Sequence, residues 1–104
     1  MSKLNNDAFS IIAVAGDGRA KLNEALKEAR KGNYGSAKGC LEDAEKQLLK
    51  AHELQTALLK EEAEGSITDT YNVIVAHAQD YVMTAEAMKD IVAEIINLYE
   101  KVEN

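Results

Sequence analysis

Apolar residues recur at every third or fourth position along most of this chain, a spacing that predicts amphipathic helices. In the middle of the sequence, one such stripe alternates large and small residues: Tyr34, Ala37, Leu41, Ala44, Leu48, Ala51, Gln55 and Leu58. A weaker stripe precedes it, interrupted by Arg19 and adjoined by Gly16 and Gly18: Ala8, Ile12, Ala15, Leu22, Leu26 and Ala29. A glycine costs about 1 kcal/mol inside a helix, so we expect both glycines to allow close contact with another helix.

Two further glycines divide the pattern into three helices. Gly32 follows a run of basic residues, which is typical of a helix end with a left-handed glycine, and Asn33 can cap the next helix. Gly65 marks a second break, after which Ser66 and Asp69 predict a capping box. The expected helices cover roughly residues 6–31, 34–64 and 67–101. Because the connections are short, the expected fold is all-α, a three-helix up-down-up antiparallel bundle in a single domain, residues 1–104.

The third predicted helix carries two apolar stripes. The first has coiled-coil spacing and is expected to pack on the other two helices: Ile74, Ala78, Tyr81, Ala85, Met88, Val92, Ile95, Tyr99 and Val102. The other stripe lies about 100° around the helix. We call it the second face, and it consists of Val73, His77, Asp80, Thr84, Ala87, Ile91 and Leu98. A bundle of three helices has one interior, so the second face predicts self-association.

Composition narrows the classes of function. The chain has 104 residues, no proline and no tryptophan, and its net charge of -6 comes from interspersed acidic and basic residues. This pattern lacks the dense basic patch that nucleic-acid binding requires. The single cysteine, Cys40, excludes an intrachain disulfide and is expected to pack as a small apolar residue. Without a signal peptide or an apolar run of about 18 residues, the chain is expected to be soluble and cytoplasmic, with no direct membrane insertion.

His77 and Asp80 are the residues with the clearest chemical potential. They lie three positions apart in a helical pattern and therefore share one face. An imidazole is largely neutral and nucleophilic near neutral pH, so it can accept a phosphoryl group and pass it on. A carboxylate one turn away could orient the ring or bind a cation. On spacing alone, however, a buried structural histidine beside a solvated acid explains the pair more simply.

The second face gives Asp80 a further consequence. If this face meets its own copies at a symmetry axis, the Asp80 carboxylates come together and repel each other unless they are protonated or bridged by a cation. A shared divalent metal ion at the axis is therefore a hypothesis that follows from the spacing.

Three segments of the chain carry more specific patterns. They are AGDGRAKLNEAL at positions 15–26, AHELQTALL at 51–59 and VAHAQDYVMT at 75–84. In this order, and over nearly the whole chain, they resemble the enzyme IIA component of the lactose/cellobiose (chitobiose) family of the bacterial phosphoenolpyruvate-dependent sugar phosphotransferase system. The third segment resembles that family's V-H-A/G-Q-D-H-L-M-T signature, whose histidine falls on His77.

The resemblance implies a phosphotransferase component built as a homotrimer of three-helix subunits. His77 would accept a phosphoryl group from the phosphocarrier protein HPr and pass it to the cognate enzyme IIB, for uptake of a β-linked disaccharide of the cellobiose, chitobiose or lactose type. Asp80 would match the aspartate that meets its symmetry mates around one divalent ion per trimer, usually described as Mg²⁺.

Three other residues of the signature segments need separate interpretation. Tyr81 stands where the family most often has a histidine, and we interpret it as a packing residue that could also alter the wall of the cleft. Gln79 could contact phosphate oxygens across a subunit boundary, or could be an exposed helical glutamine. His52 and Gln55 match the AH-x-x-Q pattern and are expected to form a structural polar pair rather than a catalytic one.

Two alternative functions remain open at this point. One is a histidine phosphotransfer module of two-component signalling, although that class uses four helices and would favour a small residue where Asp80 stands. The other is a non-catalytic helical adaptor, with His77 and Asp80 as parts of an oligomer interface. A di-iron bundle is poorly supported, because the sequence contains no Glu-x-x-His pair.

Overall fold

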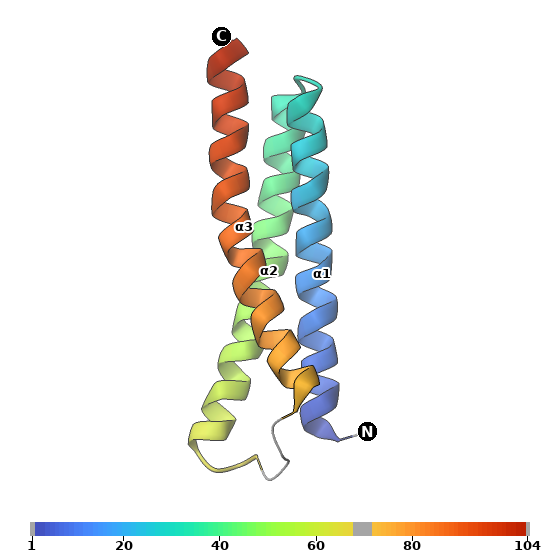
Figure 1. Ribbon diagram of the computed structural model, residues 1–104, viewed down its shortest axis with the longest axis vertical. Coiled ribbons are helices and arrows are strands. Elements are labelled where there is room, and N and C mark those ends of the chain that lie inside the picture. The colour runs from blue at the N-terminus through green and yellow to red at the C-terminus, as the bar shows by residue number, and fades with distance from the viewer. Residues whose placement is uncertain (1, 68–71, 104) are drawn as a thin grey trace.

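The computed structural model describes residues 2–67 and 72–103, and its elements are three long helices. They are α1 (Lys3–Arg30), α2 (Tyr34–Ala63) and α3 (Val73–Glu103). Helix α2 runs antiparallel to α1 and α3 runs back alongside them, so the molecule is a rod with extents of 55 × 22 × 19 Å (Figure 1). The predicted all-α, up-down-up bundle is therefore confirmed. None of the helices described is long and apolar enough to cross a membrane.

Glycines end both helices of the α1–α2 hairpin, as predicted. Gly32 has φ 85° and Gly65 has φ 76°, values that only glycine adopts without strain. At the end of α1, the backbone N–H of Gly32 donates to the carbonyl of Ala29 and that of Asn33 donates to the carbonyl of Glu28. At the end of α2, the backbone N–H of Gly65 donates to the carbonyl of Glu62 and that of Ser66 donates to the carbonyl of Glu61. These are Schellman motifs, which satisfy the last carbonyls of a helix and turn the chain.

The helix starts differ more from the predictions. Ser2 caps α1 by accepting a hydrogen bond from the backbone N–H of Asn5. Asn33 holds the N-cap position of α2, but its side chain donates to Glu28 rather than capping the helix. Helix α3 begins at Val73, six residues later than the predicted start near residue 67. Of the predicted capping box, Ser66 lies outside the helices and Asp69 lies outside the described residues.

Asn72 performs the capping role that was assigned to Ser66. Its side-chain oxygen accepts a hydrogen bond from the backbone N–H of Val75 at 3.1 Å. Its amide nitrogen also donates to the side-chain oxygen of Asn5 on α1, at 2.8 Å. The start of α3 is therefore fixed by a contact with α1 as well as by local capping.

The interior consists of two clusters of alanines and branched aliphatic residues along the rod. The first cluster lies near the N-terminus of the chain: Leu4, Ala8, Ile11, Ala15, Ala51, Leu58, Val75, Ala78 and Val82. The second lies toward the α1–α2 turn: Leu22, Ala25, Ala29, Ala37, Ala44, Leu48, Ala85, Val92 and Ile96. Cys40 packs against the second cluster, and burial raises the pKa of its thiol, in keeping with its predicted role as a small apolar residue.

The packing face of α3 is partly different from the predicted stripe. Ala78, Ala85 and Val92 are buried as expected, and Ile74, Tyr81, Met88 and Ile95 are half-buried. However, Tyr99 and Val102 are exposed, while the most buried large residues of α3 are Val75, Val82 and Ile96. The buried face of α3 is thus rotated from the predicted stripe toward the row that contains Val75, Val82 and Ile96.

The glycine pair in α1 faces two different helices. A Cβ atom on Gly18 would lie 2.7 Å from Cδ2 and 2.8 Å from Cγ of Leu48, so only glycine allows α1 to lie this close to α2. A Cβ on Gly16 would meet Tyr81 of α3 at 3.6 Å, which is an ordinary contact distance. Close helix contact, the predicted reason for both glycines, is therefore strict at Gly18 and relaxed at Gly16.

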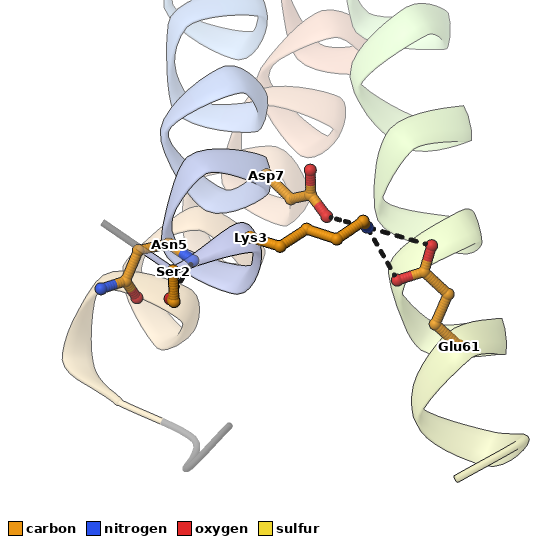
Figure 2. Close-up of polar contacts among 5 residues, drawn as sticks. All are labelled: Ser2, Lys3, Asn5, Asp7 and Glu61. Atoms are coloured by element: carbon orange, nitrogen blue, oxygen red, sulfur yellow. Dashed lines mark hydrogen bonds and ion pairs between the residues drawn. The ribbon is translucent and has the colours of Figure 1, made fainter. Parts of the chain in front are cut away.

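Exposed polar contacts join the helices at both ends of the rod. Figure 2 shows Lys3 reaching from α1 to Glu61 on α2 while it also pairs with Asp7. At the opposite end, Tyr34 donates a hydrogen bond to Glu103, and this carboxylate raises the pKa of Tyr34 to about 12. Exposed polar contacts are screened by solvent and add little to stability, so these contacts align the helix ends more than they stabilise the bundle.

Candidate functional site

The candidate site lies on the second face, which α3 turns away from the core. All seven of its residues are exposed in the single chain: Val73, His77, Asp80, Thr84, Ala87, Ile91 and Leu98. His77 and Asp80 therefore share one helix face, as their spacing predicted, and the structure shows that this face is accessible in the single chain. The simpler alternative of a buried structural histidine does not apply to His77.

The His77 imidazole is held by an aromatic ring rather than by a hydrogen bond. Its ring stacks on that of Tyr81, one turn further along α3, with centroids 5.6 Å apart and planes inclined by 12°. Within the described ranges 2–67 and 72–103, no hydrogen bond or ion pair reaches the imidazole. Because both ring nitrogens lack a partner there, neither is engaged in a hydrogen bond that an attack on an electrophile would have to break.

Tyr81 connects this imidazole to α1. It is half-buried and packs against the first cluster, which confirms its interpretation as a packing residue. The guanidinium carbon of Arg19 lies 4.9 Å from the centroid of the Tyr81 ring, within the range of a cation–π contact. In the sequence, Arg19 stands out only as an interruption of an apolar stripe. That charge in an otherwise apolar row was the available signal of a specific contact.

Gln79 lies apart from the imidazole within one chain. It is half-buried, whereas His77 and Asp80 are exposed. It also precedes Glu86 by two helical turns on α3, so it belongs to the side of the helix that approaches α2. A contact between Gln79 and a phosphoryl group on another subunit stays a prediction.

The second histidine has a different environment. His52 is exposed on α2, and its Nδ1 atom lies 2.9 Å from Oε1 of Glu86 on α3. The predicted polar pair with Gln55 is not formed. Instead, Gln55 is half-buried, and its buried Oε1 has no hydrogen-bond partner in the part of the chain that the structure describes. Glu86 was not among the residues predicted from the sequence. Its contact joins His52 to α3 and engages the Nδ1 atom of the His52 ring.

A single chain does not assemble a metal site by itself. Among the residues described, no group of three or more His, Cys, Asp or Glu side chains is placed to hold an ion. Asp80 offers one exposed carboxylate, a hard oxygen ligand of the kind that Mg²⁺ prefers. A metal ion at Asp80 would therefore need ligands from further copies of the chain or from solvent.

Large apolar side chains accompany His77 and Asp80 on the outer surface of α3. Val73 is 83% exposed, Leu98 60% and Ile91 58%. Near the C-terminal end of α3, an apolar hollow of about 320 Å³ is lined by Ile95, Leu98, Tyr99 and Val102. Such a row is unusual for a surface that remains in water.

Comparison with known proteins identifies the family of this chain. The model of the PTS lactose/cellobiose-specific IIA subunit family matches residues 6–100. The lichenan-specific phosphotransferase enzyme IIA component of Bacillus subtilis (strain 168) is 44% identical over 94 residues, which cover 90% of this chain and 84% of that protein.

Solved structures agree with this match. The PTS cellobiose-specific enzyme IIA from Bacillus anthracis has a TM-score of 0.93 at 35% identity, over 99% of this chain and 94% of that one. A chain from the IIA(chitobiose)–HPr complex of the N,N'-diacetylchitobiose branch of the Escherichia coli phosphotransferase system has a TM-score of 0.85 at 28% identity, over 100% of both chains.

The fold and these relatives together define a phosphotransferase component of a sugar transport system. The chain belongs to the lactose/cellobiose-specific IIA family of the phosphotransferase system. The family resemblance seen in the sequence is thereby confirmed.

Proposed function

We propose that this protein is a phosphocarrier that accepts a phosphoryl group on His77 from phosphorylated HPr and passes it to the cognate enzyme IIB. The transfer serves the uptake and phosphorylation of a β-linked disaccharide of the cellobiose, chitobiose or lactose type. Family membership supports the relay, and a similar chain in complex with HPr supports the donor. The observation that carries the residue assignment is the exposed His77 imidazole, which has no hydrogen-bond partner among the residues described.

The chemistry is a displacement at phosphorus. A neutral ring nitrogen of His77 attacks the phosphorus atom, the N–P bond of the donor phosphohistidine breaks, and the donor imidazole leaves with the electron pair of that bond. In the onward transfer, a nucleophile of enzyme IIB attacks the phosphorus atom on His77, the N–P bond to His77 breaks, and the His77 imidazole leaves with the electron pair of that bond. Phosphoryl transfer runs through a loose transition state, so the protein contributes mainly position and charge stabilisation. An exposed imidazole whose nitrogens have no hydrogen-bond partner among the residues described is accessible to the donor, which is a precondition for that positioning.

The same proposal includes a homotrimer that covers the apolar residues of the second face and leaves His77 open at the seam between subunits. Self-association would bury Val73, Ile91 and Leu98, which are more than half exposed in the single chain. Apolar burial contributes about 25 cal/mol per Å², so a shared row of this size favours association. Three copies of Asp80 would then meet at the axis, and their mutual repulsion would be relieved by Mg²⁺ or another divalent cation, one per trimer. We place this phosphocarrier in the cytoplasm, where HPr operates.

Phosphoryl acceptance can be tested directly. The purified chain is incubated with phosphoenolpyruvate, enzyme I and HPr, and acid-labile phosphate on the chain is measured. We expect wild type and His52→Ala to be labelled and His77→Ala to remain unlabelled. His52→Ala is the matched control, because both histidines are exposed helical residues. Labelling of folded His77→Ala would overturn the residue assignment, and failure of the folded wild type to be labelled would favour the non-catalytic adaptor.

A further inference from the structure

The His77 ring needs something to fix its orientation. It projects from an exposed helix face, and no described residue offers it a hydrogen bond. An imidazole on such a face can rotate about two side-chain torsions, and in-line attack requires one orientation that points a nitrogen at the donor phosphorus. Its recorded contact is the nearly parallel ring of Tyr81, with centroids 5.6 Å apart. This separation falls within the range of favourable aromatic stacking.

Tyr81 is well suited to serve as a fixed platform. Its ring is half-buried against the first cluster and extends across to α1. A Cβ atom added to Gly16 would lie 3.6 Å from the Tyr81 hydroxyl oxygen and 3.8 Å from Cε2, so the ring lies close to the backbone of α1. Arg19, one helical turn beyond Gly16, places its guanidinium carbon 4.9 Å from the ring centroid. The Tyr81 ring of α3 is therefore held by packing against the first cluster and by the Arg19 guanidinium of α1.

We propose that Tyr81 is a positioning residue for phosphoryl transfer: its ring, anchored to α1 by Arg19, holds the His77 imidazole in the orientation that accepts the phosphoryl group. The inference rests on the proposed function of His77, and it concerns a position at which this chain departs from the usual family histidine. A residue that only fills space would affect stability. A positioning residue also affects the rate of transfer after binding.

The test combines two measurements on three variants. Tyr81→Leu removes the ring, Tyr81→Phe keeps it, and Arg19→Met removes the cation while keeping a long side chain. Initial rates of phosphoryl transfer from phosphorylated HPr give kcat and KM. Proton NMR of the imidazole reports the ring current of the stacked tyrosine, which shields protons lying over its face. The control for loss of one positive charge is Arg30→Met, an exposed site near the end of α1.

For Tyr81→Leu we expect kcat to fall about three- to tenfold with KM nearly unchanged, and the His77 ring protons to move downfield. Tyr81→Phe should retain the wild-type kcat and His77 resonances. Arg19→Met should show a smaller change in the same direction as Tyr81→Leu, whereas Arg30→Met should match wild type.

Wild-type kcat and unmoved His77 resonances in folded Tyr81→Leu would overturn the proposal. If Tyr81→Leu does not fold, Arg19→Met decides, because identical behaviour of Arg19→Met and Arg30→Met in both measurements would equally overturn it. A failure of the underlying function has a different signature, since wild type would then remain unlabelled while its NMR spectrum still showed the shielded imidazole.

Discussion

The two sides of α3 are both rich in apolar residues, yet only one is covered within the chain. Val75, Val82 and Ile96 are at most 2% exposed because α1 and α2 pack over them. On the second face, Ile91 and Leu98 are 58% and 60% exposed. The contrast shows that an apolar pattern records which side chains avoid water, but not what covers them. The hairpin covers one face, and a further copy of the chain is our proposed cover for the other.

The largest expected effect comes from placing a charge on the second face. Ile91→Glu should convert a trimer into single chains of 11.4 kDa while leaving the helices intact, because association would otherwise desolvate three added carboxylates. Sedimentation velocity and circular dichroism measure the two parts of this outcome. Leu49→Glu on α2 is a matched control, since Leu49 and Ile91 are both 58% exposed. A wild-type protein that sediments as a monomer would contradict the proposed assembly.

A truncation on the buried face should instead weaken the fold itself. Ile96 is 1% exposed within the second cluster, so Ile96→Ala should lower the free energy of unfolding by about 2–4 kcal/mol through lost burial and a residual cavity. Urea denaturation measures the change. Leu49→Ala, at an exposed site, should cost less than about 1 kcal/mol. Equal losses in the two variants would mean that Ile96 is not part of a packed interior.

The glycine pair of α1 tests the hairpin on which the buried face rests. Gly18→Ala should destabilise the fold by about 1–3 kcal/mol, because its methyl group would overlap Leu48. Gly16→Ala is its control two residues away, where the methyl group makes ordinary contact with Tyr81. Better helix propensity should there raise stability by up to about 1 kcal/mol. Thermal melts of both variants measure the difference, and changes of the same sign would contradict the packing described.

The smallest effect is expected at Asp80. Asp80→Asn removes the like-charge repulsion at the proposed axis and also a ligand charge, so the assembly should remain folded but lose its response to Mg²⁺. The shift of the melting temperature on adding Mg²⁺, compared with EDTA, measures this response. Asp90→Asn, also exposed on α3, controls for the loss of one negative charge. An unchanged response in Asp80→Asn would remove Asp80 from the metal site.

Helix ends were predictable where the signal is local. Gly32 and Gly65 adopt positive φ, a conformation that glycine takes at little cost, so the break is encoded in the residue itself. The start of α3 was not predictable in this way, because serine, aspartate and asparagine all cap helices well. Asn72 is selected by its additional hydrogen bond to Asn5 on α1, a contact between distant parts of the sequence.

The faces of α3 show the same limit. Three adjacent rows of its side chains are apolar, and the row with Ala78, Ala85 and Val92 was assigned correctly to the core. Which flanking row lies deepest depends on the tilt of α3 against the hairpin, and a periodic pattern does not specify that tilt. That His77 and Asp80 share one face followed from their spacing, whereas the exposure of His77 in the single chain did not. The contact of Arg19 with Tyr81 joins two helices, so only the folded structure reveals it.

Gly18 and Arg19 are consecutive residues with unrelated contacts, one pressed against Leu48 of α2 and the other over Tyr81 of α3. Any displacement of α1 from α2 therefore also moves the Arg19 guanidinium that lies over the Tyr81 ring. A genetic selection for bacteria that no longer grow on the transported sugar should consequently recover substitutions at the α1–α2 contact, at positions that never meet a phosphate.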